Sequence, residues 1–215
     1  MPRFTVVVIY YQGVHPPEVF RRGVGSVLAQ TFTDYELAVY HDGPLLEAVP
    51  EVDGRRLEVR CTPRRHNDWG HSLRDVGIRE ARGDYVLLLN ADNVLYPRCL
   101  AALEAESRRP PRLLVGGKPA DTDNILIFPI LYFDLVRFME SWLRLPKGSG
   151  AKLIMTGDPP LYGMIDAMQL VMKRELWLAE GGWWDKREDA DGHLYPALCR
   201  KYGYRTLAEV LGEHH

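Results

Sequence analysis

The stretch from Gly83 to Pro97, GDYVLLLNADNVLYP, constrains the fold of this chain more than any other. Its run from Tyr85 to Leu89 is apolar without strict alternation, which is typical of a strand buried on both faces. Asn90 follows directly and Asp92 comes two residues later, where open α/β sheets bind their ligands. Oxygens of a carboxylate and an amide at that place suit a hard divalent cation. The alternative is that both side chains only form the turn that ends the strand.

The first half of the chain alternates strand and helix signals. The β-branched and aromatic run at 4–11 predicts a strand, and Pro17 suits the first turn of a helix because proline has no amide to leave unpaired there. This order predicts an α/β fold with a mostly parallel central sheet and helices on both faces. The expected strands are 4–11, 35–40, 57–61 and 85–89, and the expected helices are 17–28, 69–80 with Gly83 as the C-cap, and 98–106.

The second half is less regular. An apolar face at helical spacing, which includes Leu135, Met139 and Trp142, predicts a helix over 131–145. Residues 146–163 are rich in glycine and proline and predict a long mobile loop of the kind that forms lids. The other expected elements are strands at 113–115, 125–128 and 169–172, a polar loop at 116–124, a turn at 180–184 and a helix at 193–202 with Leu194, Ala197 and Leu198 inward.

Length and charge limit the classes of protein. The 215 residues suit one domain, and a net charge of −2 gives no electrostatic footprint for nucleic acid. Three distant cysteines without a CxxC pair favour reduced thiols, so we expect a soluble, cytoplasmic protein. The early apolar run is too short to span a bilayer. The final pair, His214 and His215, is either native or a tag remnant and does not enter the prediction.

Acidic residues follow three predicted elements: Asp42, Asp92 and the cluster 188–191. Arg74 lies in the first turns of a predicted helix, whose free amides already favour anions. The acidic residues can also be read as solvated caps, and Arg74 as part of a solvated helix face. For the cluster that alternative is an exposed loop in which Asp191 caps the next helix.

Trp183 and Trp184 follow two glycines and could stack on a sugar ring, although such pairs more often place one ring in the core. The sequence has no Gly-rich phosphate loop of either common type and no recognisable Ser-His-Asp or Cys-His signature. Common nucleotide-binding and hydrolase motifs therefore do not explain the acidic residues.

The order of motifs resembles the inverting family-2 glycosyltransferases of the GT-A fold along nearly the whole chain. Four stretches carry the resemblance: VVVIYYQG near the start, SVLAQTFTDYELAVYHDGP at 26–44, SLRDVGIREARGDYVLLLNADNVLYP at 72–97 and GGWWDKREDADGHL at 181–194. The chain departs from the family pattern at four positions. Ile9 stands where proline is common, and His41 stands where the family usually has an acid. Asp75 stands in place of the usual Asn, and Asn90 in place of the usual Asp. Asn90 lowers the negative charge for a metal, and His41 bears on the choice of nucleotide.

The resemblance implies roles on the donor side. Tyr11 would stack near the nucleotide base, and Asp42 would read the base, typically uracil. Arg74 would lie beside the nucleotide. Asp92, with Asn90, would hold a divalent cation, manganese or magnesium, that bridges to the diphosphate. On this basis residues 1–97 form the nucleotide-sugar-binding half of a single GT-A domain that spans 1–215.

The acceptor half would then be residues 98–215. By the same resemblance, Asp189 would be the general base, and Trp183, Trp184 and Glu188 would border the acceptor. The expected activity is metal-assisted transfer of a sugar, with inversion, from a UDP-linked donor to a carbohydrate, lipid-linked or small-molecule acceptor. The alternatives are a non-catalytic nucleotide-sugar-binding module and a sugar nucleotidylyltransferase. The latter usually needs an arginine-containing loop after the first strand, and here that loop, YYQGVHPPE, has none.

Overall fold

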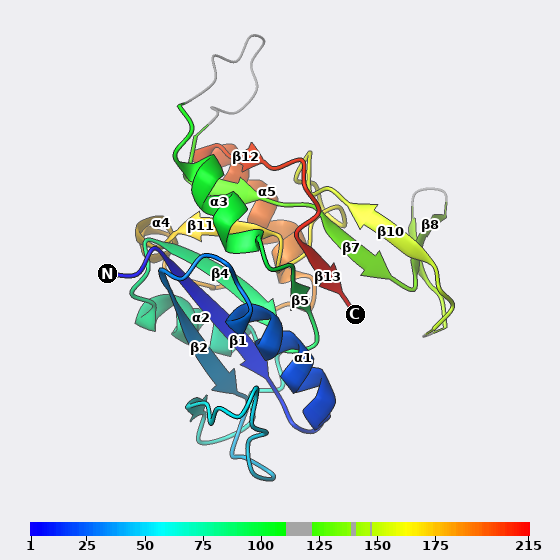
Figure 1. Ribbon diagram of the computed structural model, residues 1–215. Helices are drawn as coiled ribbons and strands as arrows, with labels where there is room; N and C mark the ends of the chain where they lie inside the picture. The colour runs from blue at the N-terminus through cyan, green and yellow to red at the C-terminus, as the bar shows by residue number, and fades with distance from the viewer. Residues whose placement is uncertain (111–121, 139–140, 147) are drawn as a thin grey trace.

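A seven-stranded sheet forms the centre of the computed structural model, which describes residues 1–110, 122–138, 141–146 and 148–215 (Figure 1). The strand order is β12-β6-β11-β4-β1-β2-β3. All neighbours pair in parallel except β11, which runs antiparallel to both β4 and β6. The predicted, mostly parallel α/β sheet is confirmed. Its strands are β1 (Phe4–Tyr10), β2 (Tyr35–His41), β3 (Val59–Cys61), β4 (Tyr85–Asn90), β6 (Ile125–Ile127), β11 (Leu170–Lys173) and β12 (Arg205–Thr206).

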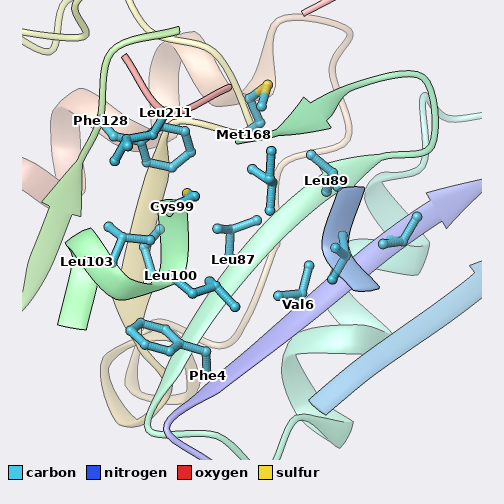
Figure 2. Packing of buried hydrophobic residues seen from close by; sticks show 14 of the residues in the cluster. Phe4, Val6, Leu87, Leu89, Cys99, Leu100, Leu103, Phe128, Met168 and Leu211 are labelled. Carbon is cyan, nitrogen blue, oxygen red and sulfur yellow. The ribbon is translucent and has the colours of Figure 1, made fainter. Parts of the chain in front are cut away.

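Helices cover both faces of this sheet. The cluster on one face joins β1 and β4 to α1 (Pro17–Leu28) and α3 (Cys99–Ser107), and Figure 2 shows Leu87 facing α3. The cluster on the other face joins the alternate residues of the same strands to α2 (His71–Glu80), α4 (Arg174–Ala179) and α5 (Ala190–Tyr202). Both sets of β1 side chains are therefore buried, which explains its continuous apolar sequence. Truncating a fully buried leucine such as Leu100 to alanine should cost about 2–5 kcal/mol.

The order of strands reverses at β1. The chain passes from β1 to β2 on one side and later returns to β4 on the other, so a crevice opens beyond the carboxyl ends of β1 and β4. The register pairs Tyr10 with His41 and Ile9 with Asn90. The residues that follow each strand are thereby brought to one edge of the sheet.

The prediction of a helix over 131–145 is wrong for the described residues of that range. They contribute to β7 (Ile130–Phe133) and to a hairpin of β8 (Leu135–Phe138) and β9 (Ser141–Arg144). Asp134 between them has a left-handed φ of 55°, which ends any helix, and its carboxylate accepts hydrogen bonds from Gly148 and Ser149. Pairing with segments far away in the chain overrides the local periodicity.

A second sheet, of four strands, has the order β10-β7-β13-β5 and extends to one side of the main sheet (Figure 1). Its remaining strands are β5 (Val94–Leu95), β10 (Lys152–Met155) and β13 (Gly212–His214). The predicted loop 146–163 thus contains a strand, and the residues set aside at the C-terminus complete a sheet. The expected strand 113–115 and most of the loop 116–124 lie outside the described residues.

Other differences are local. Helix α2 ends at Glu80 with Ala81 as its C-cap, before the predicted Gly83. Helix α5 begins at Ala190, three residues earlier than predicted, and Ala197 faces outward. None of the helices in the described ranges is long and apolar enough to cross a membrane.

Candidate functional site

A pocket of about 530 Å³ opens at the carboxyl ends of β1, β2 and β4. The sheet, the loop before α2 and the start of α5 all contribute to its wall. Five residues predicted from the sequence line it, namely Tyr11, Asp42, Arg74, Asn90 and Glu188. The other lining residues are Ile9, Tyr10, Val14, His15, Arg65, Asn67, Trp69, Gly70, His71, Asp166, Ala167, Asp191 and His214.

At one end of the pocket, Asp42 organises the loop that precedes α2. Its Oδ1 accepts from the amide of His66 (2.8 Å) and its Oδ2 accepts from the amide of Asn67 (3.0 Å). The guanidinium carbon of Arg65 lies 3.8 Å from the centre of the Tyr11 ring, and Arg65 Nε lies 3.8 Å from Asp42 Oδ2. An aromatic ring, a carboxylate and a cation therefore meet where the sequence predicted the nucleotide base.

His41, which precedes Asp42 where the family usually has an acid, is fully buried and does not line the pocket. Its Nδ1 lies 2.8 Å from the Gly43 carbonyl, and its Nε2 lies 3.1 Å from the amide of Gln12. Only the tautomer with the proton on Nδ1 makes both hydrogen bonds. His41 therefore joins the loops after β1 and β2 and supports the pocket from behind.

Arg74 forms the floor of the pocket and is only 3% exposed. Its Nη1 donates to the Trp69 carbonyl (2.7 Å) and lies 3.2 Å from His71 Nδ1, and its Nη2 donates to Asn90 Oδ1 (2.8 Å). Its Nε has no partner among the described residues. All of these partners are neutral acceptors, so they fix the guanidinium without neutralising it.

The charge of Arg74 is consequently uncompensated at short range. Among the described residues no carboxylate forms a close ion pair with it, and the charges of Asp191, Asp166 and Asp68 act on it from a greater distance. Burial, and then the neighbouring charge of Arg74, lower the pKa of His71 to about 4, so this histidine stays neutral and accepts from Arg74. A buried cation without a directly hydrogen-bonded anion is costly unless a ligand supplies one. The pocket floor is therefore built to receive an anionic group.

Asp92 lies beside two histidines at the same edge. His15 Nε2 is 3.7 Å from Asp92 Oδ2, while Asp92 Oδ1 is enclosed and has no partner in the described part of the chain. Burial raises the pKa of Asp92, but the contact with His15 and the charges of His15 and His214 outweigh it, so the pKa is lowered overall. The carboxylate is ionised and has one free oxygen.

A preformed metal centre is not seen. Within the described ranges, no group of three or more His, Cys, Asp or Glu side chains is arranged to hold a metal ion. The oxygen of Asn90, predicted as a ligand, already accepts from Arg74. His214 Nδ1 is enclosed and without a partner among the described residues. Asp92 therefore offers a free oxygen and His214 a free nitrogen, as do Asp68 Oδ1 and His71 Nε2 elsewhere in the described part of the chain.

Asp191 also lines the pocket and lies in the first turn of α5. Its Oδ1 accepts from the amide of Gly192 (2.9 Å). Burial, followed by the negative charge of Asp166, raises the pKa of Asp191 to about 6, and Arg74 opposes this shift. A carboxylate with a raised pKa that faces a pocket is suited to accept a proton near neutral pH.

Asp189, the predicted base, points elsewhere. Its side chain is 43% exposed, and its Oδ2 accepts from Tyr162 Oη (2.7 Å) and lies 3.2 Å from His193 Nε2. It does not line the pocket. It occupies the N-cap position of α5 without a capping hydrogen bond from its side chain, so the prediction that Asp191 is the N-cap is wrong.

The two tryptophans were predicted at the acceptor, and neither lines the pocket. Trp183 is fully buried between Trp177 and His71, with ring centres 5.9 and 5.4 Å away. Its amide donates to Asp75 Oδ1 (3.0 Å), and a Cβ at Gly182 would lie 2.1 Å from the same oxygen, which explains the glycine there. Trp183 therefore supports the floor beneath His71 and Arg74. Trp184 is 56% exposed outside the pocket.

The lining residues that sequence reasoning missed include His15, Arg65, Asn67, Trp69, His71, Asp166 and His214. Asp166 had a signal, because a lone acid inside the apolar run MIDAMQL is unusual. His214 had none, because its place depends on the pairing of β13 with β7 and on stacking with Tyr132 at 4.0 Å.

Comparison with known proteins identifies the family. The model of glycosyl transferase family 2 matches residues 5–166. Succinoglycan biosynthesis protein ExoW of Rhizobium meliloti (strain 1021) is 32% identical over 102 residues, which cover 45% of this chain and 31% of that protein. The chain therefore spans about a third of the relative it matches.

Solved structures show the same fold. S. aureus TarS 1–349 in complex with UDP-GlcNAc superposes with a TM-score of 0.64 at 13% identity, covering 99% of this chain and 58% of that one. The mannosyltransferase PcManGT from Pyrobaculum calidifontis, in complex with GDP-Man and Mn²⁺, gives 0.59 at 14% identity, covering 99% and 56%. With the mostly parallel sheet and the match over 5–166, these results show that the chain belongs to glycosyltransferase family 2 and has a GT-A fold.

Proposed function

We propose that this protein transfers a sugar, with inversion, from a UDP-linked donor to an acceptor hydroxyl. The observation that carries the proposal is Arg74, a buried cation held only by neutral partners on the floor of the pocket. A diphosphate is an anion of the right kind to lie against it. Tyr11 and Asp42, proposed for the base, and the carboxylate of Asp191 line the same pocket.

The base would bind at Tyr11 and Asp42. The ring of Tyr11 offers a stacking surface on which Arg65 already lies. Each oxygen of Asp42 accepts one amide hydrogen bond and keeps capacity for a second, so the carboxylate can accept from the N–H of a uracil. UDP-GlcNAc is bound by S. aureus TarS, and GDP-Man is bound by PcManGT, so members of this fold differ in the base.

Arg74 would act on the leaving group. As the anomeric C–O bond breaks, its electron pair departs with the diphosphate, and negative charge grows on the phosphate oxygens. A guanidinium fixed by Trp69, His71 and Asn90 stabilises that charge without having to reorient. Asn90 in place of an acid leaves the charge of Arg74 available to the donor.

A divalent cation, manganese or magnesium, would be held by Asp92, whose Oδ1 is free, with His214 as the second side chain. Donor phosphates and water would complete its coordination, since the described residues provide no larger cluster. The bound cation would supply further stabilisation of the departing diphosphate. The arrangement does not favour Asn90 as a direct ligand.

Asp191 would be the general base, in preference to Asp189. The acceptor oxygen forms the new bond from the face opposite the leaving group, and its proton moves to Asp191. Asp191 lines the pocket and has a raised pKa, whereas Asp189 is exposed and bound to Tyr162. A single base on the acceptor side is what inversion requires. Of the predicted acceptor residues, Glu188 alone lines the pocket.

The proposal retains a nucleotide half (1–97), an acceptor half (98–215) and a cytoplasmic location. Its test is a thermal-shift and calorimetric comparison of UDP, GDP and UDP-sugars, each with manganese and with a chelator. We expect UDP to bind more tightly than GDP, and manganese to tighten UDP binding. Tighter binding of GDP would refute the uridine assignment, and binding of UDP-sugars without turnover on any acceptor would favour the binding module.

A further inference from the structure

Trp69 is a bulky residue at a backbone position with a positive φ, where glycine, asparagine and aspartate are the usual residues. Its ring is 60% exposed and lines the pocket. Its φ of 55° lies in the left-handed region that costs a bulky residue about 1–2 kcal/mol. Backbone strain of this kind persists only where the surrounding structure holds it, and strained residues cluster at ligand sites.

The loop that presents Trp69 is fixed at both ends. Asp42 holds the amides of His66 and Asn67 on one side. On the other side, Asp68 Oδ2 accepts from the amide (3.0 Å) and the hydroxyl (2.6 Å) of Ser72, at the start of α2. The Trp69 carbonyl itself accepts from Arg74. The backbone of Trp69 is therefore pinned to the pocket floor while its ring remains in solvent.

The position of Trp69 relative to Arg74 indicates which part of a ligand it would meet. The Trp69 carbonyl accepts from Arg74 (2.7 Å), and the Trp69 ring centre lies 6.5 Å from that of His71, whose Nδ1 also contacts Arg74. If Arg74 holds the diphosphate, the group one bond beyond it, on the side of Asp191, is the transferred sugar. The flat apolar face of a pyranose packs well on an indole.

We propose that Trp69 is a specificity-determining residue that stacks on the transferred sugar of the donor. The inference rests on the proposed function, since it takes Arg74 as the diphosphate site. Trp69 would add affinity for UDP-sugars over UDP and would favour sugars with an unobstructed apolar face. It would leave recognition of the base to Tyr11 and Asp42.

The test compares UDP with UDP-glucose, UDP-galactose and UDP-N-acetylglucosamine by titration calorimetry. For Trp69→Gly we expect affinity for the best UDP-sugar to fall about tenfold, with UDP affinity unchanged. Glycine accepts the positive φ, so we expect a melting temperature within about 4 °C of wild type. Trp69→Asn, which also tolerates this φ, should repeat the loss, and Trp69→Phe should recover most of it.

Trp184→Gly is the matched control, because Trp184 is 56% exposed but outside the pocket, and it should bind every ligand like wild type. Unchanged UDP-sugar affinity in Trp69→Gly and Trp69→Asn would overturn the inference. An equal loss for UDP and UDP-sugars would also overturn it, because Trp69 would then serve the nucleotide. A wild-type protein that binds no nucleotide at all would instead overturn the proposed function, and the inference with it.

Discussion

Replacing Asp191 by asparagine should make the protein more stable and inactive at the same time. Burial and the charge of Asp166 raise the pKa of Asp191 from an ordinary 3.8 to about 6. The carboxylate is therefore destabilised in the folded state once it ionises. The difference in pKa corresponds to roughly 3 kcal/mol of folding free energy, a net figure that already includes the attraction of Arg74.

The sign depends on pH. Between about pH 4 and pH 6 the folded state keeps the Asp191 proton while the unfolded chain releases it, so wild-type stability falls as pH rises through this window. Asparagine has no proton to lose. The variant should match wild type near pH 4 and exceed it above pH 6, by roughly 6 to 12 °C in melting temperature for a chain of this size.

The assay is thermal unfolding at pH 4.5 and pH 8, followed by single-turnover transfer once an acceptor is known. For Asp191→Asn the transfer rate should drop about 10²- to 10⁴-fold with donor affinity nearly unchanged, because the lost interaction belongs to the transition state. Asp189→Asn is the control and should change both quantities little. Equal stability of Asp191→Asn and wild type at pH 8 would refute the raised pKa of Asp191, and an inactive Asp189→Asn would refute the assignment of the base.

The remaining predictions concern the donor side. Arg74→Gln keeps hydrogen-bonding capacity but removes the buried charge, so UDP affinity measured by calorimetry should fall about 10- to 100-fold. Asn90→Asp places a carboxylate where an oxygen now lies 2.8 Å from Arg74, so UDP binding in chelator should weaken while its dependence on manganese grows. Asp92→Ala should abolish the tightening of UDP binding by manganese and leave the circular-dichroism spectrum unchanged; tightening that persists would contradict the proposed ligand.

The sheet and its ligand edge were predictable from the sequence because their signals are local. Tyr85–Asn90 is apolar throughout since both faces of β4 are covered, and that burial pattern requires no knowledge of the partners. Parallel strands also bring their carboxyl ends to one edge by necessity. Tyr11, Asp42, Arg74 and Asn90 accordingly line one pocket.

Pairing between distant segments could not be predicted in the same way. The apolar spacing of 131–145 fits a helix in isolation, but β7 is stabilised by β10 and β13, and its ladder partners in β13 are about eighty residues away. Hydrogen bonds of a ladder depend on that partner, and the local pattern does not contain it. The same pairing carries His214 to the pocket.

The direction of individual side chains also needed the tertiary structure. Asp189 and Asp191 are two residues apart at the start of one helix, so sequence alone could not say which of them faces the pocket; the rotation of α5 against the sheet decides it. Likewise Trp183 and Trp184 are adjacent in one turn, but only the ring of Trp183 lies in the core, where its amide donates to Asp75 and its ring packs against Trp177. The sequence determined which chemical groups stand at the edge of the sheet, and packing determined which of them point into the site.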